Sequence, residues 1–125
     1  MASLNKVFLI GRLVADPELS HTQNGTPFTR FRIAVNRPYR DRSGNWQEDT
    51  VFIDIVVWGE AADRAVSRFN KGTRVLVEGR LQQRSWETES GEKRSKIEVR
   101  AERVVALDPR RELDENIEEI DDIEF

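Results

Sequence analysis

The chain has 125 residues with a formal net charge of −3; 38% are hydrophobic and 34% charged, which suits one small domain with a short extension. No stretch approaches the roughly 20 apolar residues of a membrane-spanning helix, and no secretory signal opens the chain, so we expect a cytoplasmic protein without membrane contact. With no cysteine and one histidine, disulfides, thiolate metal sites and paired-imidazole sites are excluded, and we expect no metal and no cofactor.

Two strands are predicted in the first third of the chain. Residues 4–14 alternate apolar and polar side chains at the period of a β-strand until Asp16-Pro17 ends the pattern. Asn24-Gly25 supplies a hairpin turn, and the alternation resumes after Pro27. The phase opposite the predicted core carries Lys6, Phe8, Ile10 and Arg12 in the first strand, and Arg30 and Arg32 in the second.

In the middle of the chain the spacing of apolar residues changes twice. Residues 37–46 are rich in arginine and turn-forming residues and are predicted to form a basic loop. The third strand, residues 50–58, has four aliphatic residues in the core phase and Phe52 and Trp58 in the other. From residue 60 to residue 71 apolar residues recur at helical spacing, and Gly72 is expected to cap this helix in the left-handed conformation.

The last third returns to the period of a strand. Residues 73–88 form the fourth predicted strand, in which Gly79 marks a bend or bulge. A turn follows, and residues 94–107 form the last strand before Asp108-Pro109 ends the body of the protein. In the fourth strand the phase opposite the core carries Arg80, Arg84 and Trp86.

Three strands, one helix and two further strands are the element order of an OB-fold, a five-stranded Greek-key barrel that binds oligonucleotides or oligosaccharides. Other small all-β barrels are the alternative, and the helix together with the long, bent fourth strand favours the OB-fold. We therefore predict an all-β protein with one helix between its third and fourth strands. The barrel occupies residues 1–108, and residues 109–125 form a short linker and a disordered acidic tail.

Charge is divided unevenly between these two parts. All 20 basic residues and 15 of the 23 acidic residues lie in residues 1–111, which gives this segment a net charge of +5. Residues 112–125 contain eight acidic residues and no basic ones. The division favours a polyanion-binding body with a separate interaction tail, although a solvated surface with a solubilising tail explains the charge equally well.

A surface that binds single-stranded nucleic acid without sequence preference needs aromatic side chains that stack on bases and cations that follow the phosphates. The non-core strand phases gather both kinds of residue, and the basic loop adds more. We predict base stacking by Tyr39, Phe52, Trp58 and Trp86. We predict phosphate contacts by Arg12, Arg30, Arg32, Arg40, Arg42, Arg80, Arg84 and Lys93.

Two alternatives compete with this interpretation. The aromatic residues can instead serve packing, with Phe52 and Trp58 in a second small core or a subunit contact, and Tyr39 and Trp46 against the barrel. An enzyme would need a pocket in which an acid and a base converge, and His21 has no serine and acid partner in the sequence. No glycine-rich phosphate-binding loop is present either, so we expect a non-catalytic protein.

Several stretches together also resemble one family over essentially the whole chain. They are residues 5–13 with Asp16-Pro17-Glu18, residues 52–59, residues 71–81, and Arg84-Ser85-Trp86 with the turn at Ser90-Gly91. They resemble bacterial single-stranded DNA-binding proteins of the replication and repair type. The resemblance implies non-specific coating and protection of single-stranded DNA during replication, recombination and repair, in the cytoplasm at the nucleoid.

The resemblance also implies roles for particular residues. It places stacking aromatics at Tyr39, Phe52, Trp58 and Trp86, where the family often has tryptophan at the first two positions, and it assigns no role to Trp46. It implies a homotetramer, for which our candidate contact residues are Lys6, Phe8, Ile10 and Ile53. A primosome-type OB accessory protein, which uses a similar barrel as an adaptor, is the alternative within the binding class.

The acidic tail carries the remaining implication of the resemblance. In the family the C-terminal tip docks onto replication and repair proteins, and here the tip is Asp121, Asp122, Ile123, Glu124 and Phe125, with Glu124 where the family has proline. The spacing of Leu113, Ile117 and Ile120 allows an amphipathic helix on a partner, and disorder in the free protein is the alternative that we favour. The tail that ends in phenylalanine favours the single-strand binder over the accessory protein.

Overall fold

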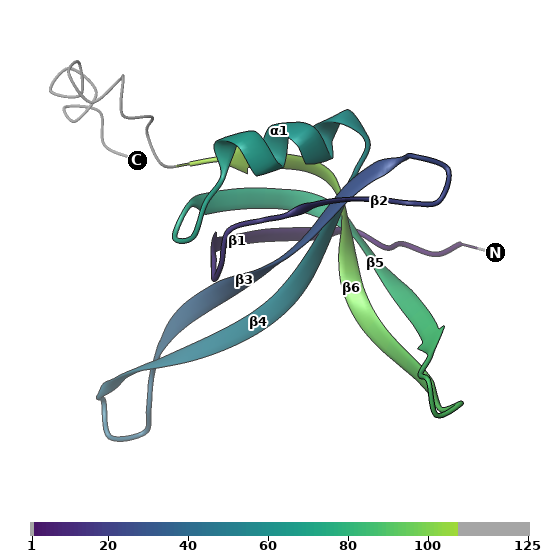
Figure 1. Ribbon diagram of the computed structural model, residues 1–125. Helices are drawn as coiled ribbons and strands as arrows, with labels where there is room; N and C mark the ends of the chain where they lie inside the picture. The colour runs from purple at the N-terminus through teal and green to yellow at the C-terminus, as the bar shows by residue number, and fades with distance from the viewer. Residues whose placement is uncertain (1, 108–125) are drawn as a thin grey trace, which may run out of the picture.

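The first strand (Val7–Leu13) closes the barrel because it pairs with two other strands, with Arg74–Glu87 along most of its length and with Pro27–Arg40 at Arg12 and Leu13. The computed structural model describes residues 2–107 (Figure 1). Its strands are β1 (Val7–Leu13), β2 (Leu19–His21), β3 (Pro27–Arg40), β4 (Trp46–Trp58), β5 (Arg74–Glu87) and β6 (Lys93–Ala106). One helix, α1 (Glu60–Arg68), separates β4 from β5.

The closed barrel consists of β1, β5, β6, β4 and β3, with the short β2 added beside β3. This architecture confirms the predicted all-β OB-fold with one helix between the third and fourth barrel strands. None of the described helices is long and apolar enough to cross a membrane. The acidic tip predicted to bind partners lies outside the described residues.

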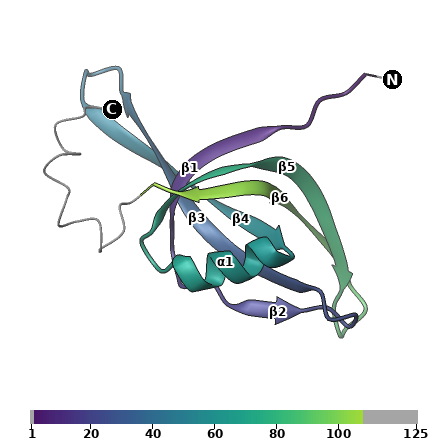
Figure 2. The same ribbon diagram turned by 90° about the horizontal axis from the view of Figure 1, so that it is seen from above.

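Strand alternation places one side of each strand in the core. The fully buried aliphatic residues of this core include Ile33, Ile55, Val75, Val77 and Val99. Val56 is also fully buried but lies on the opposite side of β4 from Ile55, outside the core cluster. Helix α1 covers the end of the barrel, as Figure 2 shows from above, and buries Ala62 and Ala65 there. Phe69 follows the helix in extended conformation, and its ring meets the ring of Phe31 edge-on at 6.5 Å between centroids.

Two pairs of strands continue beyond the barrel as hairpin arms, which diverge from it in Figures 1 and 2. In the first arm, β3 and β4 pair without interruption up to Arg40 and Trp46. In the second arm, β5 and β6 pair up to Glu87 and Lys93. The arms are joined by a seam in which β4 and β6 run parallel, with only the pairs Ile55 with Val99 and Val56 with Arg100.

The prediction of a basic loop over residues 37–46 is wrong, because strand pairing includes both ends of this segment. Only residues 41–45 form the turn, which the Asp41 carboxylate closes by accepting hydrogen bonds from the backbone N–H groups of Ser43 and Asn45 at 2.9 Å. Cross-strand polar contacts follow the arm, such as the ion pair of Arg37 with Asp49 at 3.2 Å. A solvated two-stranded ribbon needs no apolar alternation, so its sequence resembles that of a loop.

The predicted ends of the helix also need correction. The helix ends at Arg68, three residues earlier than expected, because Phe69 leaves the helical path and is buried. Gly72 does not cap the helix, although its φ of +90° is left-handed as predicted. It lies in a turn in which the backbone N–H of Thr73 donates to the carbonyl of Asn70 at 3.0 Å.

The bulge predicted at Gly79 is confirmed by a register shift between Glu78 and Gly79 in the β5–β6 ladder. A Cβ atom at position 79 would lie 2.2 Å from the carbonyl oxygen of Arg100, so only glycine fits this crossing without backbone movement. Strand β5 pairs with β1 up to Gly79 and beyond it only with β6. The bulge thus separates the barrel part of β5 from the part that forms the arm.

Candidate nucleic-acid interface

The strand register determines which of the predicted residues share a surface. Side chains of directly paired residues point to the same face, so Arg32 with Asp54 and Ala34 with Phe52 lie on one face of the first arm. The seam continues this face onto β6 at Arg100, and the β5–β6 ladder continues it to Trp86. This surface, the groove face, carries Phe28, Arg30, Arg32, Phe52, Asp54, Trp58, Arg80, Gln82, Arg84, Trp86, Arg94, Lys96, Glu98 and Arg100.

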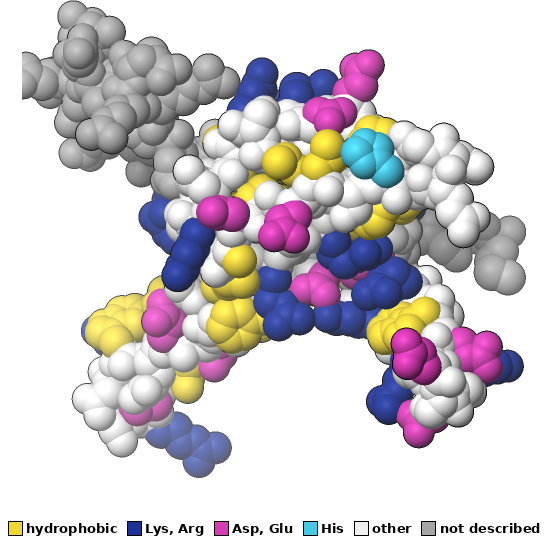
Figure 3. All heavy atoms as spheres, in the orientation of Figure 1, with side chains coloured by type: hydrophobic (Ala, Val, Ile, Leu, Met, Phe, Trp, Pro, Cys, Tyr) yellow, Lys and Arg dark blue, Asp and Glu magenta, His cyan; other side chains and the backbone are white. Residues whose placement is uncertain are grey.

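The groove face is hollowed between the two arms. Figure 3 shows Lys and Arg side chains gathered at the head of this hollow, with acidic side chains among them and hydrophobic ones on both sides. Phe52, on the first arm, is 59% exposed, and Trp86, on the second arm, is 40% exposed. Large aromatic residues exposed to this degree on both sides of a cationic hollow are available to a ligand rather than to the core.

Trp58 has a mixed environment. Its ring packs against Phe28 at 4.9 Å between centroids, and the guanidinium of Arg100 lies 5.7 Å from the ring centroid. The residue is half-buried, and its indole N–H has no hydrogen-bond partner among the described residues. Packing therefore fixes the ring of Trp58 at the head of the hollow while part of it stays accessible.

Two carboxylates organise the cations of the groove face. Glu98 is fully buried and pairs with Arg30 at 2.9 Å and with Arg84 at 3.3 Å. Asp54 accepts a hydrogen bond from Arg32 at 2.9 Å and pairs with Lys96. Each carboxylate thus holds two cations in place, so less side-chain entropy is lost when those cations meet an anion.

The pKa of Asp54 is lowered from its ordinary value. Burial by itself would raise this pKa, but the hydrogen bonds from Arg32 and Lys96 and the positive charges of both groups outweigh burial. Asp54 is therefore ionised near neutral pH and keeps both cations oriented.

Aromatic rings on the groove face have cations beside them. The guanidinium of Arg84 lies 4.5 Å from the centroid of the Trp86 ring, and that of Arg30 lies 5.6 Å from the Phe28 ring. Each pair holds a cation next to an aromatic ring, and these are the two kinds of group that sites for single-stranded nucleic acid combine.

The remaining predicted phosphate contacts are spread more widely. Arg12, on β1, donates a hydrogen bond to the carbonyl of Gly72 at 2.8 Å. Arg40 and Arg42 lie at the tip of the first arm, and Lys93 begins β6 at the tip of the second. Tyr39 pairs with Gln47, and the register therefore places it on the opposite face of the first arm from Phe52.

The predicted subunit contacts lie on other surfaces. On β1, Phe8 is 64% exposed and Ile10 is also exposed. Lys6 forms ion pairs with Glu78 at 2.8 Å and Glu102 at 3.3 Å. Ile53 is partly buried against the core.

Sequence reasoning missed the contribution of β6 to the groove face. Lys96, Glu98 and Arg100 alternate with Ile97 and Val99, and this alternation places all three on one side of a strand. The same parity argument that selected Arg80 and Trp86 would have found them. It would not have identified Glu98 as buried, because that depends on the neighbouring arm.

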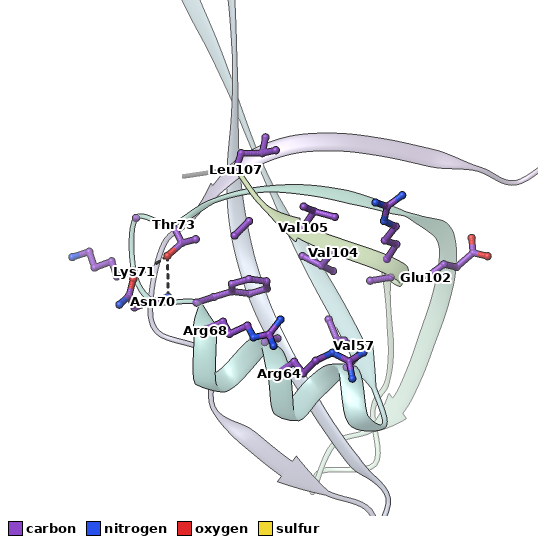
Figure 4. A pocket seen from close by; sticks show the side chains of 17 residues that line it. Val57, Arg64, Arg68, Asn70, Lys71, Thr73, Glu102, Val104, Val105 and Leu107 are labelled. Carbon is purple, nitrogen blue, oxygen red and sulfur yellow. Dashed lines mark hydrogen bonds between the residues drawn. The ribbon is translucent and has the colours of Figure 1, made fainter. Parts of the chain in front are cut away.

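A second hollow lies between α1 and the end of β6, lined by Val57, Arg64, Phe69, Glu102, Val104 and other residues (Figure 4). Glu102 is the carboxylate among its lining residues, which include no histidine or cysteine. Among residues 2–107 no group of His, Cys, Asp or Glu has the arrangement of a metal site.

Comparison with known proteins identifies one family. The model of the single-strand binding protein family matches residues 4–107. The single-stranded DNA-binding protein of Aquifex aeolicus is 48% identical over 101 residues, which cover 81% of this chain and 68% of that protein. That of Thermotoga maritima is 44% identical over 123 residues, which cover 97% of this chain and 87% of that protein.

A solved structure shows the same relationship. The Plasmodium falciparum SSB in complex with ssDNA superimposes with a TM-score of 0.77 at 30% identity, over 86% of this chain and 98% of that chain.

Proposed function

Because the chain belongs to the single-strand binding protein family, we propose that it binds single-stranded DNA on the groove face, as a non-catalytic protein. The observation that carries this proposal is the arrangement of that face: exposed Phe52 and Trp86 on two arms, with fixed cations between them. Bases stack on the rings and phosphates meet the cations. Neither contact depends on the identity of the base, so binding is independent of sequence.

Stacking and charge have separate roles in this binding. A base that stacks on an aromatic side chain gains about 1–3 kcal/mol, so a few platforms suffice for tight binding. Phosphate contacts release counterions, so affinity falls as the salt concentration rises.

The test is the substitution Trp86→Ala. It removes one platform and leaves the barrel unchanged, so we expect binding of oligodeoxythymidylate to weaken by about 1–3 kcal/mol with no change in Tm. Titration that follows quenching of tryptophan fluorescence measures this. The matched control is Ile97→Ala, because Ile97 is 52% exposed on the same arm but lies on the opposite face. Equal binding by Trp86→Ala and the unsubstituted chain would reject the proposal for Trp86.

We propose further that the protein acts in DNA replication, recombination and repair and recruits partner proteins through its acidic tip. The tip residues Asp121, Asp122, Ile123, Glu124 and Phe125 resemble the tip of the family. The physical support is an acidic segment attached to a basic body, since such a segment is available to partners when DNA occupies the body. We expect a chain that lacks these five residues to lose binding to partner proteins and to retain DNA binding.

We also propose that the chain assembles as a homotetramer through β1. Phe8 and Ile10 form an exposed apolar strand surface that an assembly would cover, and burying each side chain contributes about 1.5–3 kcal/mol. We expect Phe8→Glu to lower the solution mass by light scattering while the circular dichroism of the barrel is retained. Phe8→Leu, which keeps the apolar surface, should leave the mass unchanged. A single-chain mass for the unsubstituted protein would refute the assembly.

A further inference from the structure

A second exposed tryptophan lies at the tip of the first arm. Trp46 begins β4 and is 64% exposed. Its cross-strand partner is Arg40, whose guanidinium lies 4.9 Å from the centroid of the Trp46 ring. This is the same combination of indole and arginine that Trp86 and Arg84 form on the second arm.

The register places Trp46 on the groove face. Residues 46, 48, 50 and 52 of β4 alternate with residues on the other side of the ladder, so Trp46 and Phe52 point to the same face. Tyr39 pairs with Gln47 and points to the opposite face, where it is half-buried with the guanidinium of Arg37 at 5.8 Å from its ring. Among the aromatic residues near this tip, Trp46 therefore faces the hollow and Tyr39 does not.

We propose that Trp46, together with Arg40, is a base-stacking platform for single-stranded DNA, and that it takes the place of Tyr39 on this arm. The proposal rests on single-stranded DNA binding as proposed above and adds a subsite beyond Phe52. Trp46 and Phe52 are six residue steps apart along β4, which corresponds to about 20 Å at 3.3–3.4 Å per residue.

The ligand of this subsite is a nucleobase with its adjacent phosphate. An oligonucleotide that is bound at the head of the hollow reaches Trp46 only if it is long enough to run along the first arm. Arg40 lies at the ring, and Arg42 follows in the tip turn, so the tip supplies cations that can meet the phosphates.

The experiment compares Trp46→Ala with Tyr39→Ala in the full chain, using oligodeoxythymidylates of increasing length. We expect Trp46→Ala to leave binding of the shortest oligonucleotides unchanged and to weaken binding of long ones about tenfold. Tyr39→Ala should bind all lengths as the unsubstituted chain does. Trp46→Phe should retain most of the affinity while it removes part of the fluorescence quenching, because a phenyl ring still stacks. Melting temperature and solution mass are measured for each variant.

The outcomes separate a failure of the Trp46 subsite from a failure of the proposed function. A length-dependent loss for Trp46→Ala alone supports the subsite. A loss for Tyr39→Ala but not for Trp46→Ala overturns it, as does a loss at all lengths accompanied by a lower Tm or a changed solution mass, which assigns Trp46 to packing or subunit contact. If the unsubstituted chain binds and Trp86→Ala weakens binding while Trp46→Ala does not, only the subsite fails. If the unsubstituted chain binds no oligonucleotide, both the proposed function and the subsite fail.

Discussion

The groove face carries two carboxylates among its cations, an unexpected composition for a surface that attracts a polyanion. Glu98 is fully buried and pairs with two arginines whose side chains are about one-third exposed. A buried carboxylate without partners would be strongly destabilising, and arginines without a partner would be held less firmly. The two carboxylates therefore reduce the positive potential of the groove face, but they hold its cations in fixed positions.

Asp54 makes the stability of the groove face depend on pH. Its pKa in the folded protein lies below the ordinary value of about 3.9, so its contribution is fully present above that value and is lost as the pH falls through the folded pKa. We expect Asp54→Asn to be less stable than the unsubstituted chain at neutral pH and to lose less stability on acidification. Urea unfolding from pH 7 to about pH 3 measures both effects.

The control for this prediction is Glu89→Gln, which makes the same change of charge in the exposed turn between β5 and β6. It should follow the acid profile of the unsubstituted chain. If Asp54→Asn also followed that profile, the ion pairs of Asp54 would contribute nothing to stability.

At the residue scale, sequence parity predicted that Phe52, Trp58 and Trp86 share a face, because alternation within a strand survives small errors in its ends. The position of Tyr39 is not predictable in this way, since the segment around it has the composition of a loop and therefore no strand phase. The burial of Glu98 depends on Arg30 from a distant strand, and the sequence contains no local signal for such a contact.

At the scale of elements, the close approach of β5 to β6 at Gly79 determines how β5 belongs both to the barrel and to the second arm. The barrel part of β5 pairs with β1 and β6, and the arm part pairs with β6 alone. The carbonyl of Arg100 occupies the space where a side chain at position 79 would begin. The bulge thereby fixes both the closure of the barrel and the direction of the second arm.

We expect Gly79→Ala to destabilise the protein by about 1–3 kcal/mol or more, because backbone atoms must move to admit the methyl group. The urea midpoint measures this loss, and the soluble yield reports a variant that does not fold at all. Ser85→Ala, an exposed position on the same strand, should leave the midpoint unchanged. An unaltered midpoint for Gly79→Ala would show that the crossing relaxes freely.

The order of the elements was predictable because periods of two and 3.6 residues differ clearly in this chain. The ends were harder to predict. Phe69 fits the helical pattern equally well, and only its burial against Phe31 ends α1 early. The outer part of the first arm, residues 37–49, has polar residues on both faces, so no alternation distinguishes its strands from a loop.

At the scale of the whole molecule, charge separates into a basic body and an acidic end. We propose that the eight acidic residues in residues 112–125 compete with DNA for the cations of the body, most strongly when little salt screens the charges. On this proposal, the affinity for DNA depends on a segment that lies outside the barrel in sequence.

We expect removal of residues 112–125 to increase the affinity for single-stranded DNA several-fold at low salt, and the difference should vanish as salt is added. Fluorescence titration over a salt series provides the measurement. A full-length chain with the eight acids changed to their amides should behave like the truncated one. Should only the truncated chain bind more tightly, the length of the tail rather than its charge would be responsible.

The seam between β4 and β6 holds only two residue pairs, and the two arms meet nowhere else in the strand pairing of the described residues. Beyond that seam each arm is a two-stranded ribbon, which bends without breaking a hydrogen bond of the barrel. Near the seam, two ion pairs also connect the arms, Lys96 with Asp54 and Arg30 with Glu98. Only the outer parts of the arms are therefore free of such links among the described residues. We propose that bending of these outer parts adjusts the width of the hollow to bases of different size, so that indifference to sequence arises from bending as well as from stacking.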